Sequence, residues 1–245
     1  MSQVVEGMPS STVENYLKHV LLLSEGSGEL VSMGALASAV QVVPGTATTM
    51  VKAMADEGFV EHLPRHGVKL TAEGRRLALN VLRKHRLIES FLVSVLKMDW
   101  AKVHEEAEQL EHAISDEVLD RLDALLGHPT TDPHGDPIPN RQGRLSSQVY
   151  ATLATCALDK PLRIVRVTEQ SADFLQFAEQ NGLLPGAIVR VIDRNLAGGL
   201  VTLKKMGNRT PALSVAAAGK ILVEPEKVTC KDGTLTRMEL SGTMQ

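Results

Sequence analysis

The segment that decides the fold is VSMGALASAVQVVPGTATTMVKAMADEGFVEHLPRHGVKLT, residues 31–71. Ser32 is a suitable N-cap for a short helix over 31–39, and Pro44 is placed to begin a second helix that stops at a glycine. Two short runs of strand-forming residues follow around a Pro-Arg-His-Gly turn. Residues 12–26 precede this segment and have an apolar stripe at helical spacing. Helix, helix, turn, helix and hairpin in this order predict a winged helix-turn-helix.

The composition limits the class of protein. The chain has 245 residues, enough for two or three small domains, and 43% of them are hydrophobic although 3% are aromatic. No apolar run approaches the roughly 18 residues of a membrane-spanning helix, and the N-terminus has no basic and apolar signal segment. Cys156 and Cys230 are far apart and form no motif. We therefore expect a cytoplasmic protein with no membrane partner and no disulfide framework.

Helical periodicity continues beyond the predicted hairpin and then gives way to strands. Residues 72–97, 101–115 and 116–126 have helical patterns, and residues 128–144 are rich in Pro, Gly and Asp, which indicates a linker or extended loop. From Leu162 the apolar period changes to two, which predicts a small β-barrel. The predicted fold class is mainly α with a small all-β C-terminal domain. The expected parts are a winged-helix domain over 1–76, a helical domain over 77–145, a linker over 146–160, a β domain over 161–225 and a tail over 226–245.

The run KVHEEAEQLEHAISDEVLDRL, residues 102–122, contains the strongest candidate functional residues. Four side chains of ligand type lie within about 100° of arc on the predicted helix: His104, Glu108, Glu111 and His112. His85 and Glu89, one turn apart, lie upstream. Imidazole and carboxylate groups at this spacing are candidate ligands for a divalent metal. On spacing alone, a metal site and a solvated charged helix face are about equally supported.

Five short segments resemble the diphtheria toxin repressor family of bacterial metal-dependent regulators. They are RKHRLIE (83–89), KVHEEAEQLEHAISDEV (102–118), GDPIPN (135–140), LLPGAIVRVIDR (183–194) and KILVEP (220–225). The resemblance implies a homodimer in which each subunit has a winged helix, a helical dimerisation domain with two metal sites, and a flexibly linked SH3-like (FeoA-like) domain. It also implies that metal switches on binding to double-stranded operator DNA, usually to repress genes for metal uptake.

The resemblance assigns the ligand-type residues to two sites. The first site would use Asn15, Glu108, Glu111 and His112. The second site would use His85, Glu89 and His104, with Asp173 and Gln176 of the third domain near the right place to contribute. The family's iron regulators have Cys where Glu108 stands, and its manganese regulators have Glu. Because Mn²⁺ prefers oxygen ligands, we expect a manganese-responsive repressor, with an iron-responsive one as the alternative. Asn15 departs from the family, which usually has Met or Asp there, and a neutral amide oxygen is a weaker ligand.

The predicted recognition helix and wing supply candidate DNA contacts. They are Thr46, Thr48, Thr49 and Lys52 on the helix, and Arg65 and His66 at the wing tip. A recognition helix presents its N-terminal residues to base edges, although threonines can serve bases or phosphates equally. The alternatives are a threonine-rich helix start chosen for capping and ordinary turn residues. Residues 1–76 carry six basic and eight acidic side chains, which suits a repressor that binds DNA poorly until metal reorders it.

Two other classes of protein fit parts of the pattern. A winged-helix regulator could sense a non-metal ligand, in which case metals and chelators would not change its stability or DNA affinity. A metalloenzyme could use the His/Glu cluster to activate water, but it would need an open coordination position, and this cluster lies on an expected dimerisation helix. We expect a regulator rather than an enzyme. The remaining histidines lack carboxylates at ligand spacing and are interpreted as surface or core residues: His19, His62, His128 and His134.

Overall fold

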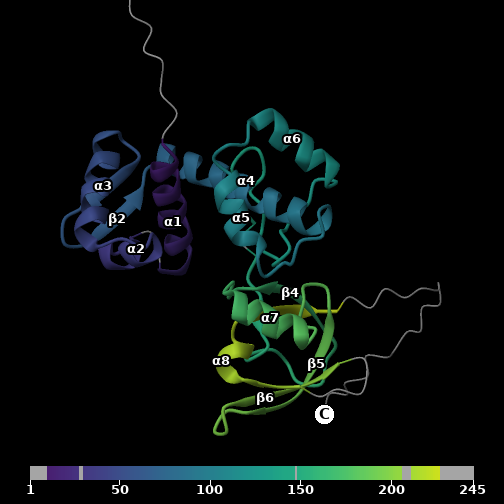
Figure 1. Ribbon diagram of the computed structural model, residues 1–245. Helices are drawn as coiled ribbons and strands as arrows, with labels where there is room; N and C mark the ends of the chain where they lie inside the picture. The colour runs from purple at the N-terminus through teal and green to yellow at the C-terminus, as the bar shows by residue number, and fades with distance from the viewer. Residues whose placement is uncertain (1–9, 28–29, 147, 206–210, 227–245) are drawn as a thin grey trace, which may run out of the picture.

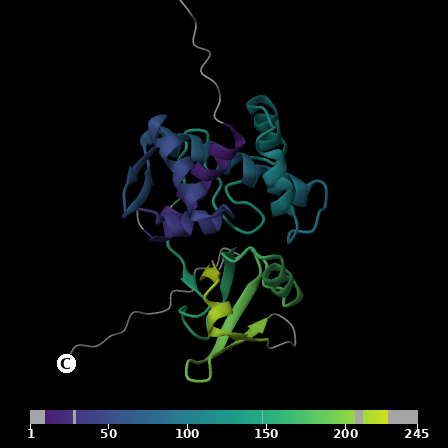
Figure 2. The same ribbon diagram turned by 60° about the vertical axis from the view of Figure 1, so that its left-hand side comes forward.

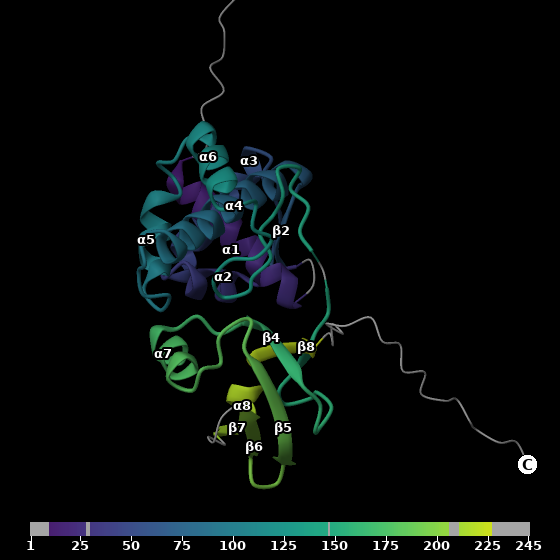
Figure 3. The same cartoon turned by 90° about the vertical axis from the view of Figure 1, so that its right-hand side faces the viewer.

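Three lobes make up the chain. Figure 1 shows the computed structural model, which describes residues 10–27, 30–146, 148–205 and 211–226. Two helical lobes lie side by side, and a lobe built on a β-sheet lies beneath both of them. The sheet lobe remains beneath the helices after rotation by 60° in Figure 2 and by 90° in Figure 3. This confirms the predicted fold class, which places helices first and a small all-β part last.

The first lobe is a winged helix-turn-helix, as predicted. Its elements are α1 (Ser11–Ser27), α2 (Met33–Ala39), α3 (Pro44–Asp56), β1 (Val60–Leu63) and β2 (Gly67–Leu70). Ser32 caps α2 by accepting a hydrogen bond from the Ala35 amide at 3.1 Å, and Pro44 begins α3. The antiparallel strands β1 and β2 form the wing. The helices bury a shared apolar core that includes Leu17, Leu36 and Val51.

The base of the wing is fixed by a close approach of two backbones. The Val31 amide donates to the Val68 carbonyl at 2.9 Å, and the Val68 amide donates to the Val31 carbonyl at the same distance. Gly67 adopts φ +140°, and a Cβ there would lie 2.2 Å from the Val31 carbonyl oxygen. Glycine therefore satisfies both the backbone angle and the contact that ties the wing to the segment before α2.

The second lobe is helical and is joined to the first by one long helix. Its elements are α4 (Ala72–Ser94), α5 (Val103–Leu110) and α6 (Asp116–Leu125). Thr71 caps α4 by accepting from the Gly74 amide, and α4 packs on both α1 and α5. The helix α5 is shorter than the predicted 101–115 because a turn follows Leu110 and Ser115 caps α6. No helix among the described residues is long and apolar enough to cross a membrane.

Residues 128–144, predicted as a linker or extended loop, instead pack tightly on α4. The Arg83 guanidinium donates to the Pro139 carbonyl at 2.8 Å, and that of Arg86 donates to the Pro137 carbonyl at 2.5 Å. Three ligand-type side chains of the loop are buried: Asp132, His134 and Asp136. Two long cationic side chains on α4 thus hold a polar loop in the interior.

The third lobe is an antiparallel sheet of six strands in the order β3-β8-β4-β5-β6-β7. Its elements are β3 (Ala151–Thr152), β4 (Leu162–Val167), α7 (Ala172–Gln180), β5 (Ile188–Asn195), β6 (Leu200–Lys205), β7 (Ala212–Ser214), α8 (Val215–Ala218) and β8 (Ile221–Pro225). Within the described residues β3 and β7 do not pair, so the expected barrel is an open sheet. β3 lies in the segment predicted as a linker, and the predicted tail falls outside the described residues except for Glu226.

The buried loop also joins the second lobe to the sheet. The Val167 amide of β4 donates to the His134 carbonyl at 2.8 Å, and Asp136 pairs with Arg166 and accepts from Gln170. Gly135 lies between them with φ +86°, and a Cβ there would be 1.9 Å from the Val165 carbonyl oxygen. Glycine is therefore required where the loop touches the sheet.

Candidate metal centre

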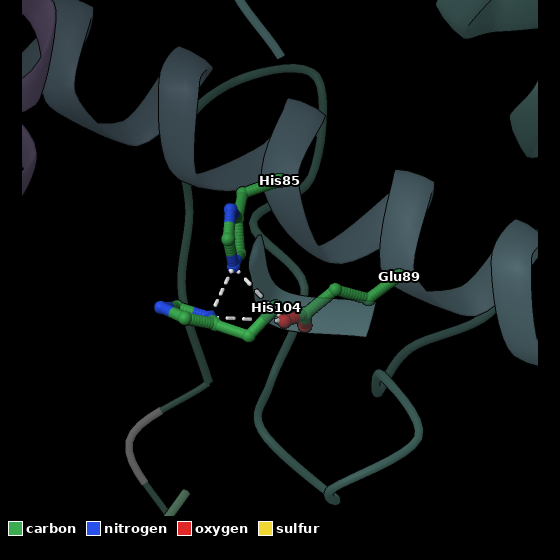
Figure 4. A group of neighbouring side chains, drawn as sticks. All are labelled: His85, Glu89 and His104. Carbon is green, nitrogen blue, oxygen red and sulfur yellow. Dashed lines mark hydrogen bonds and ion pairs between the residues drawn. The ribbon is translucent and has the colours of Figure 1, made fainter. Parts of the chain in front are cut away.

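Three predicted ligands of the second site converge on one point between α4 and α5. His85 and Glu89 are one turn apart on α4, so their side chains leave the same face, and His104 comes from the first turn of α5. His85 Nε2 lies 3.0 Å from both Glu89 Oε1 and His104 Nδ1, and His104 Nδ1 lies 3.3 Å from Glu89 Oε1 (Figure 4). Donor atoms that share a tetrahedral or octahedral ion at about 2.1 Å lie roughly 3.0–3.5 Å apart. The spacing therefore fits a divalent metal.

The charges at this cluster are those of a cation site. Burial lowers the pKa of His85, but hydrogen bonds to the Glu111 and Glu89 carboxylates outweigh it and raise the pKa to about 9. Burial raises the pKa of Glu89, yet the neighbouring imidazoles of His104, His134 and His85 hold it well below its usual value. In the metal-free chain a proton on His85 thus balances part of the buried negative charge, and an ion would have to replace it.

A second group of donors shares Glu89 and is completely buried. It consists of Glu89, Asp132 and His134, with His134 Nδ1 lying 3.8 Å from Glu89 Oε2 and 4.0 Å from Asp132 Oδ1. His134 Nδ1 and Asp132 Oδ2 are buried without a hydrogen-bond partner among the described residues. The other ring nitrogen, His134 Nε2, donates to the Trp100 carbonyl at 3.0 Å, which orients the ring toward Glu89. Unpartnered donors facing one another are what a metal ion would satisfy.

Excess negative charge supports a cation at this group. Burial, together with the nearby Asp136 and Glu89 carboxylates, raises the pKa of Asp132 to about 7. The Arg86 guanidinium is 3.7 Å from both Asp132 and Asp136 and offsets part of the charge. A cavity of about 220 Å³ is lined by Glu89 and Asp132 of these groups, and also by Arg166, Thr168 and Gln170 of the sheet lobe.

The contribution of Asp132 and His134 was missed from the sequence. His134 was interpreted as a surface or core residue because no carboxylate stands at helical spacing from it. In the structure its carboxylate partners come from α4 and from two residues before it in the same loop. The signal that could have found this group is the alternation of ligand-type residues at positions 132, 134 and 136 in DPHGD.

The predicted residues of the first site also meet, between α1 and α5, but their donor atoms are already paired. His112 Nε2 lies 2.9 Å from Asn15 Oδ1, and His112 Nδ1 donates to Glu14 Oε2 at 2.6 Å. Glu111 Oε2 accepts from His85 Nδ1 at 2.6 Å, which couples the two predicted sites. Glu108 Oε1 and Glu111 Oε1 contact the ammonium of Lys18, a residue that sequence reasoning did not single out.

The residues proposed from the third domain lie elsewhere. Asp173 and Gln176 are exposed on α7, and Asp173 belongs to none of the ligand groups found among the described residues. Gln170, just before α7, is the side chain that reaches the loop, where it donates to Asp136 Oδ2 at 2.5 Å. Gln170 therefore contacts the surroundings of the metal centre through Asp136.

The candidate DNA contacts lie on the outer surface of the winged helix. Thr46, Thr49 and Lys52 are exposed on α3, and Thr48 is half-buried. The Thr48 and Thr49 hydroxyls donate to the Pro44 and Gly45 carbonyls, so they double as local helix contacts. At the tip of the wing, Arg65 and His66 are exposed, and Arg65 has φ +68°. This surface is free among the described residues to meet a nucleic acid.

Comparison with known families assigns all three lobes. Residues 8–68 match the model of the iron dependent repressor N-terminal DNA binding domain, and residues 71–140 match that of the iron dependent repressor metal binding and dimerisation domain. Residues 151–225 match the FeoA domain. These assignments follow the division into a winged helix, a helical lobe and a sheet.

Individual relatives match most of the chain. The iron-dependent repressor IdeR of Mycobacterium tuberculosis is 30% identical over 225 residues, which cover 87% of this chain and 96% of the relative. The diphtheria toxin repressor of Corynebacterium diphtheriae is 31% identical, covering 80% of this chain and 89% of the relative. A solved structure described as a manganese-dependent transcriptional repressor in complex with manganese is similar with a TM-score of 0.79 and 35% identity, covering 87% of this chain and 100% of that one. The chain therefore belongs to the diphtheria toxin repressor family of metal-dependent, DNA-binding transcriptional repressors.

Proposed function

We propose that this chain is a Mn²⁺-responsive homodimeric repressor that binds operator DNA of metal-uptake genes when metal is bound between α4 and α5. The observation that carries the proposal is the convergence of His85, Glu89 and His104 at donor spacings of 3.0–3.3 Å. Asp132 and His134 extend the same centre through the shared Glu89. The first-site residues would form a second position for metal: Asn15, Glu108, Glu111 and His112. Lys18 already contacts the two carboxylates of this set.

The chemistry of the donors supports manganese. The donor groups around Glu89 offer imidazole nitrogen and carboxylate oxygen, and Glu108 offers oxygen where a thiolate would favour a softer metal. Cys156 is buried in the core of the sheet lobe and contributes to none of these groups. Imidazole also suits Fe²⁺, and the relatives include the iron-dependent repressor IdeR, so the iron-responsive repressor is the second candidate.

The chain's own residues connect this centre to the DNA-binding lobe. A divalent ion would supply positive charge that balances the buried carboxylates of Glu89 and Asp132. Glu111 holds His85 of α4 with one oxygen and Lys18 of α1 with the other, at 2.6 Å each. A change in the charge of His85 thus reaches α1 through a single carboxylate. The expected effect is a population shift toward the arrangement in which two recognition helices are about 34 Å apart, one turn of DNA.

Operator binding measured by fluorescence anisotropy tests the proposal. The probes are DNA fragments from upstream of the chain's own gene and of neighbouring transporter genes, titrated with chelator, with Mn²⁺, and anaerobically with Fe²⁺. Tight binding with Mn²⁺ and not with chelator is the expected result. Tighter binding with Fe²⁺ would select the iron-responsive repressor. Equal affinity with metal and with chelator would contradict metal sensing and favour a regulator of the same fold that senses another ligand.

A further inference from the structure

Lys18 is a buried cation between the two helical lobes. It lies on α1 with a relative exposure of 1%, and its Nζ is 2.7 Å from Glu108 Oε1 and 2.6 Å from Glu111 Oε1. Glu111 is fully buried and caps the C-terminal end of α5, and Glu108 lies on α5 in the second lobe. An ammonium ion is strongly destabilised away from water unless it is paired and hydrogen-bonded. Lys18 can therefore be buried only because it pairs with these two carboxylates.

The atoms that Lys18 contacts are the ones a metal at the first site would need. Glu108 and Glu111 each direct one oxygen, Oε1, to the same Nζ. The second oxygen of Glu111 is held by His85 Nδ1 at 2.6 Å and is therefore engaged elsewhere. His112, the remaining strong donor, is held by Glu14 and Asn15. Around Glu89, by contrast, His134 Nδ1 and Asp132 Oδ2 have no hydrogen-bond partner among the described residues.

We propose that Lys18 and a divalent ion exclude each other at the Glu108–Glu111 pair, so that Lys18 is the cation of this site in the metal-free chain and makes it the weaker of the two metal positions. A metal bound by a carboxylate oxygen lies about 2.0–2.2 Å from it. If Nζ kept its contacts to the same two oxygens, the ion and the ammonium would be neighbours of like charge in a buried site. This inference rests on the proposed function and deepens it.

The exclusion changes what metal does at the first site. Without metal, Lys18 already fastens α1 of the DNA-binding lobe to α5 of the second lobe. Metal binding at the first site would then replace the Lys18 contact between α1 and α5 by a contact through Asn15, which also lies on α1. It would not add a further link between the two lobes. Around Glu89 the Arg86 guanidinium stays 3.7 Å from Asp132 Oδ2, beyond hydrogen-bond distance, and His134 Nδ1 has no hydrogen-bond partner among the described residues, so this centre is expected to fill first.

Mn²⁺ titration followed by electron paramagnetic resonance of the free ion tests the exclusion on the full chain. Wild type is expected to bind one Mn²⁺ per protomer tightly and a second at least tenfold more weakly. In Lys18→Met the second constant is expected to tighten at least tenfold. Lys69→Met is the matched control, because within the described part of the chain Lys69 forms its ion pair with Glu61 on the wing, and it should titrate like wild type. Unchanged constants in Lys18→Met would overturn the inference while leaving the proposed function intact.

A second measurement uses wild type alone, in case Lys18→Met does not fold. Reductive methylation of lysines, followed by mass spectrometry, reports whether the Lys18 ammonium is accessible. Protection with no metal or one Mn²⁺ per protomer, and labelling once two are bound, is the expected result. Lys18 that stays protected with two Mn²⁺ bound would overturn the exclusion. If no Mn²⁺ binds tightly to wild type or variant, the proposed function fails, and this inference with it.

Discussion

At the scale of single residues, His85 and Glu89 connect every donor group in the centre. His85 donates to Glu111 through Nδ1 and lies within 3.0 Å of Glu89 and His104 through Nε2. Glu89 uses Oε1 toward these two rings and Oε2 toward His134. The two oxygens of the Glu89 carboxylate thus belong to two different donor groups, one with His85 and His104 and one with His134. Substituting Glu89 is therefore expected to affect both of its donor groups at once.

The raised pKa of His85 predicts that Mn²⁺ binding releases protons. The pKa of His85 is raised to about 9 in the metal-free chain, so the ring is charged at pH 7 and must lose a proton to bind metal. Mn²⁺ affinity should therefore rise with pH between 6 and 8, by about tenfold per unit for one released proton. Calorimetry in buffers of different ionisation enthalpy measures the protons released. Release of none would contradict this assignment.

The raised pKa of His85 makes the stability of the metal-free chain change with pH in the direction opposite to metal affinity. Since the folded pKa of His85 lies above the roughly 6.5 of an unfolded histidine, its contribution is fully present below pH 6.5. That contribution is lost as pH rises through about 9. Raising the pH is thus expected to weaken this part of the metal-free fold while it favours metal binding.

At the scale of elements, α4 organises the molecule. It packs against α1 of the first lobe and α5 of the second, and it carries the two arginines that hold the loop 128–144. Arg83 also pairs with Asp123 of α6 at 2.9 Å, with both side chains largely buried. The position of Asp132 and His134 therefore depends on contacts that Arg83 and Arg86 make, both within one turn of His85 on α4.

Arg83→Met is expected to destabilise the fold by about 3 kcal/mol, because it removes the guanidinium that pairs with the buried Asp123 and leaves that carboxylate only the exposed His128 ring as an ion-pair partner among the described residues. Urea unfolding of the metal-free chain measures this change. The control is Arg121→Met, whose ion pair with Glu117 is exposed and should contribute about 0–1 kcal/mol. Equal effects of the two substitutions would show that the loop is not held by Arg83.

At the scale of the whole molecule, the loop 128–144 joins the metal centre to the sheet lobe. The His134 carbonyl accepts from the Val167 amide while the His134 ring faces Glu89. Trp100, whose carbonyl accepts from the His134 ring, belongs to the apolar core of the sheet lobe. The sheet lobe is therefore expected to influence metal affinity through the position of the loop.

Gly135→Ala is expected to separate the loop from the sheet, because the added Cβ would lie 1.9 Å from the Val165 carbonyl oxygen. Overpacking of this kind costs about 1–3 kcal/mol. Gly127→Ala is a matched control with a similar positive φ of +73° and no atom within 4 Å of the added Cβ. Faster proteolysis between the second lobe and the sheet, with weaker Mn²⁺ binding, is predicted for Gly135→Ala alone. Identical behaviour of the two variants would contradict a role for this junction.

Local patterns in the sequence predicted the elements but not the contacts between them. The Ser32 cap and the Pro44 helix start are local signals, and the spacing of His85 and Glu89 followed from helical geometry. Lys18 lies 90 residues from Glu108 in the chain, and no periodicity relates them. His134 likewise gained its carboxylate neighbour Glu89 through the folding of a proline-rich loop onto α4. Only tertiary packing reveals such partners.

The central claim, that metal held at Glu89 controls DNA binding, is tested most directly by operator affinity of Glu89→Gln in Mn²⁺. The amide keeps the shape of the side chain but removes the charge shared by both donor groups, so metal affinity should fall by roughly 100-fold or more. Fluorescence anisotropy is predicted to show Glu89→Gln binding the operator as weakly as wild type with chelator. Glu179→Gln, on the exposed surface of α7, should bind like wild type in Mn²⁺. Full Mn²⁺-dependent binding by Glu89→Gln would contradict the account.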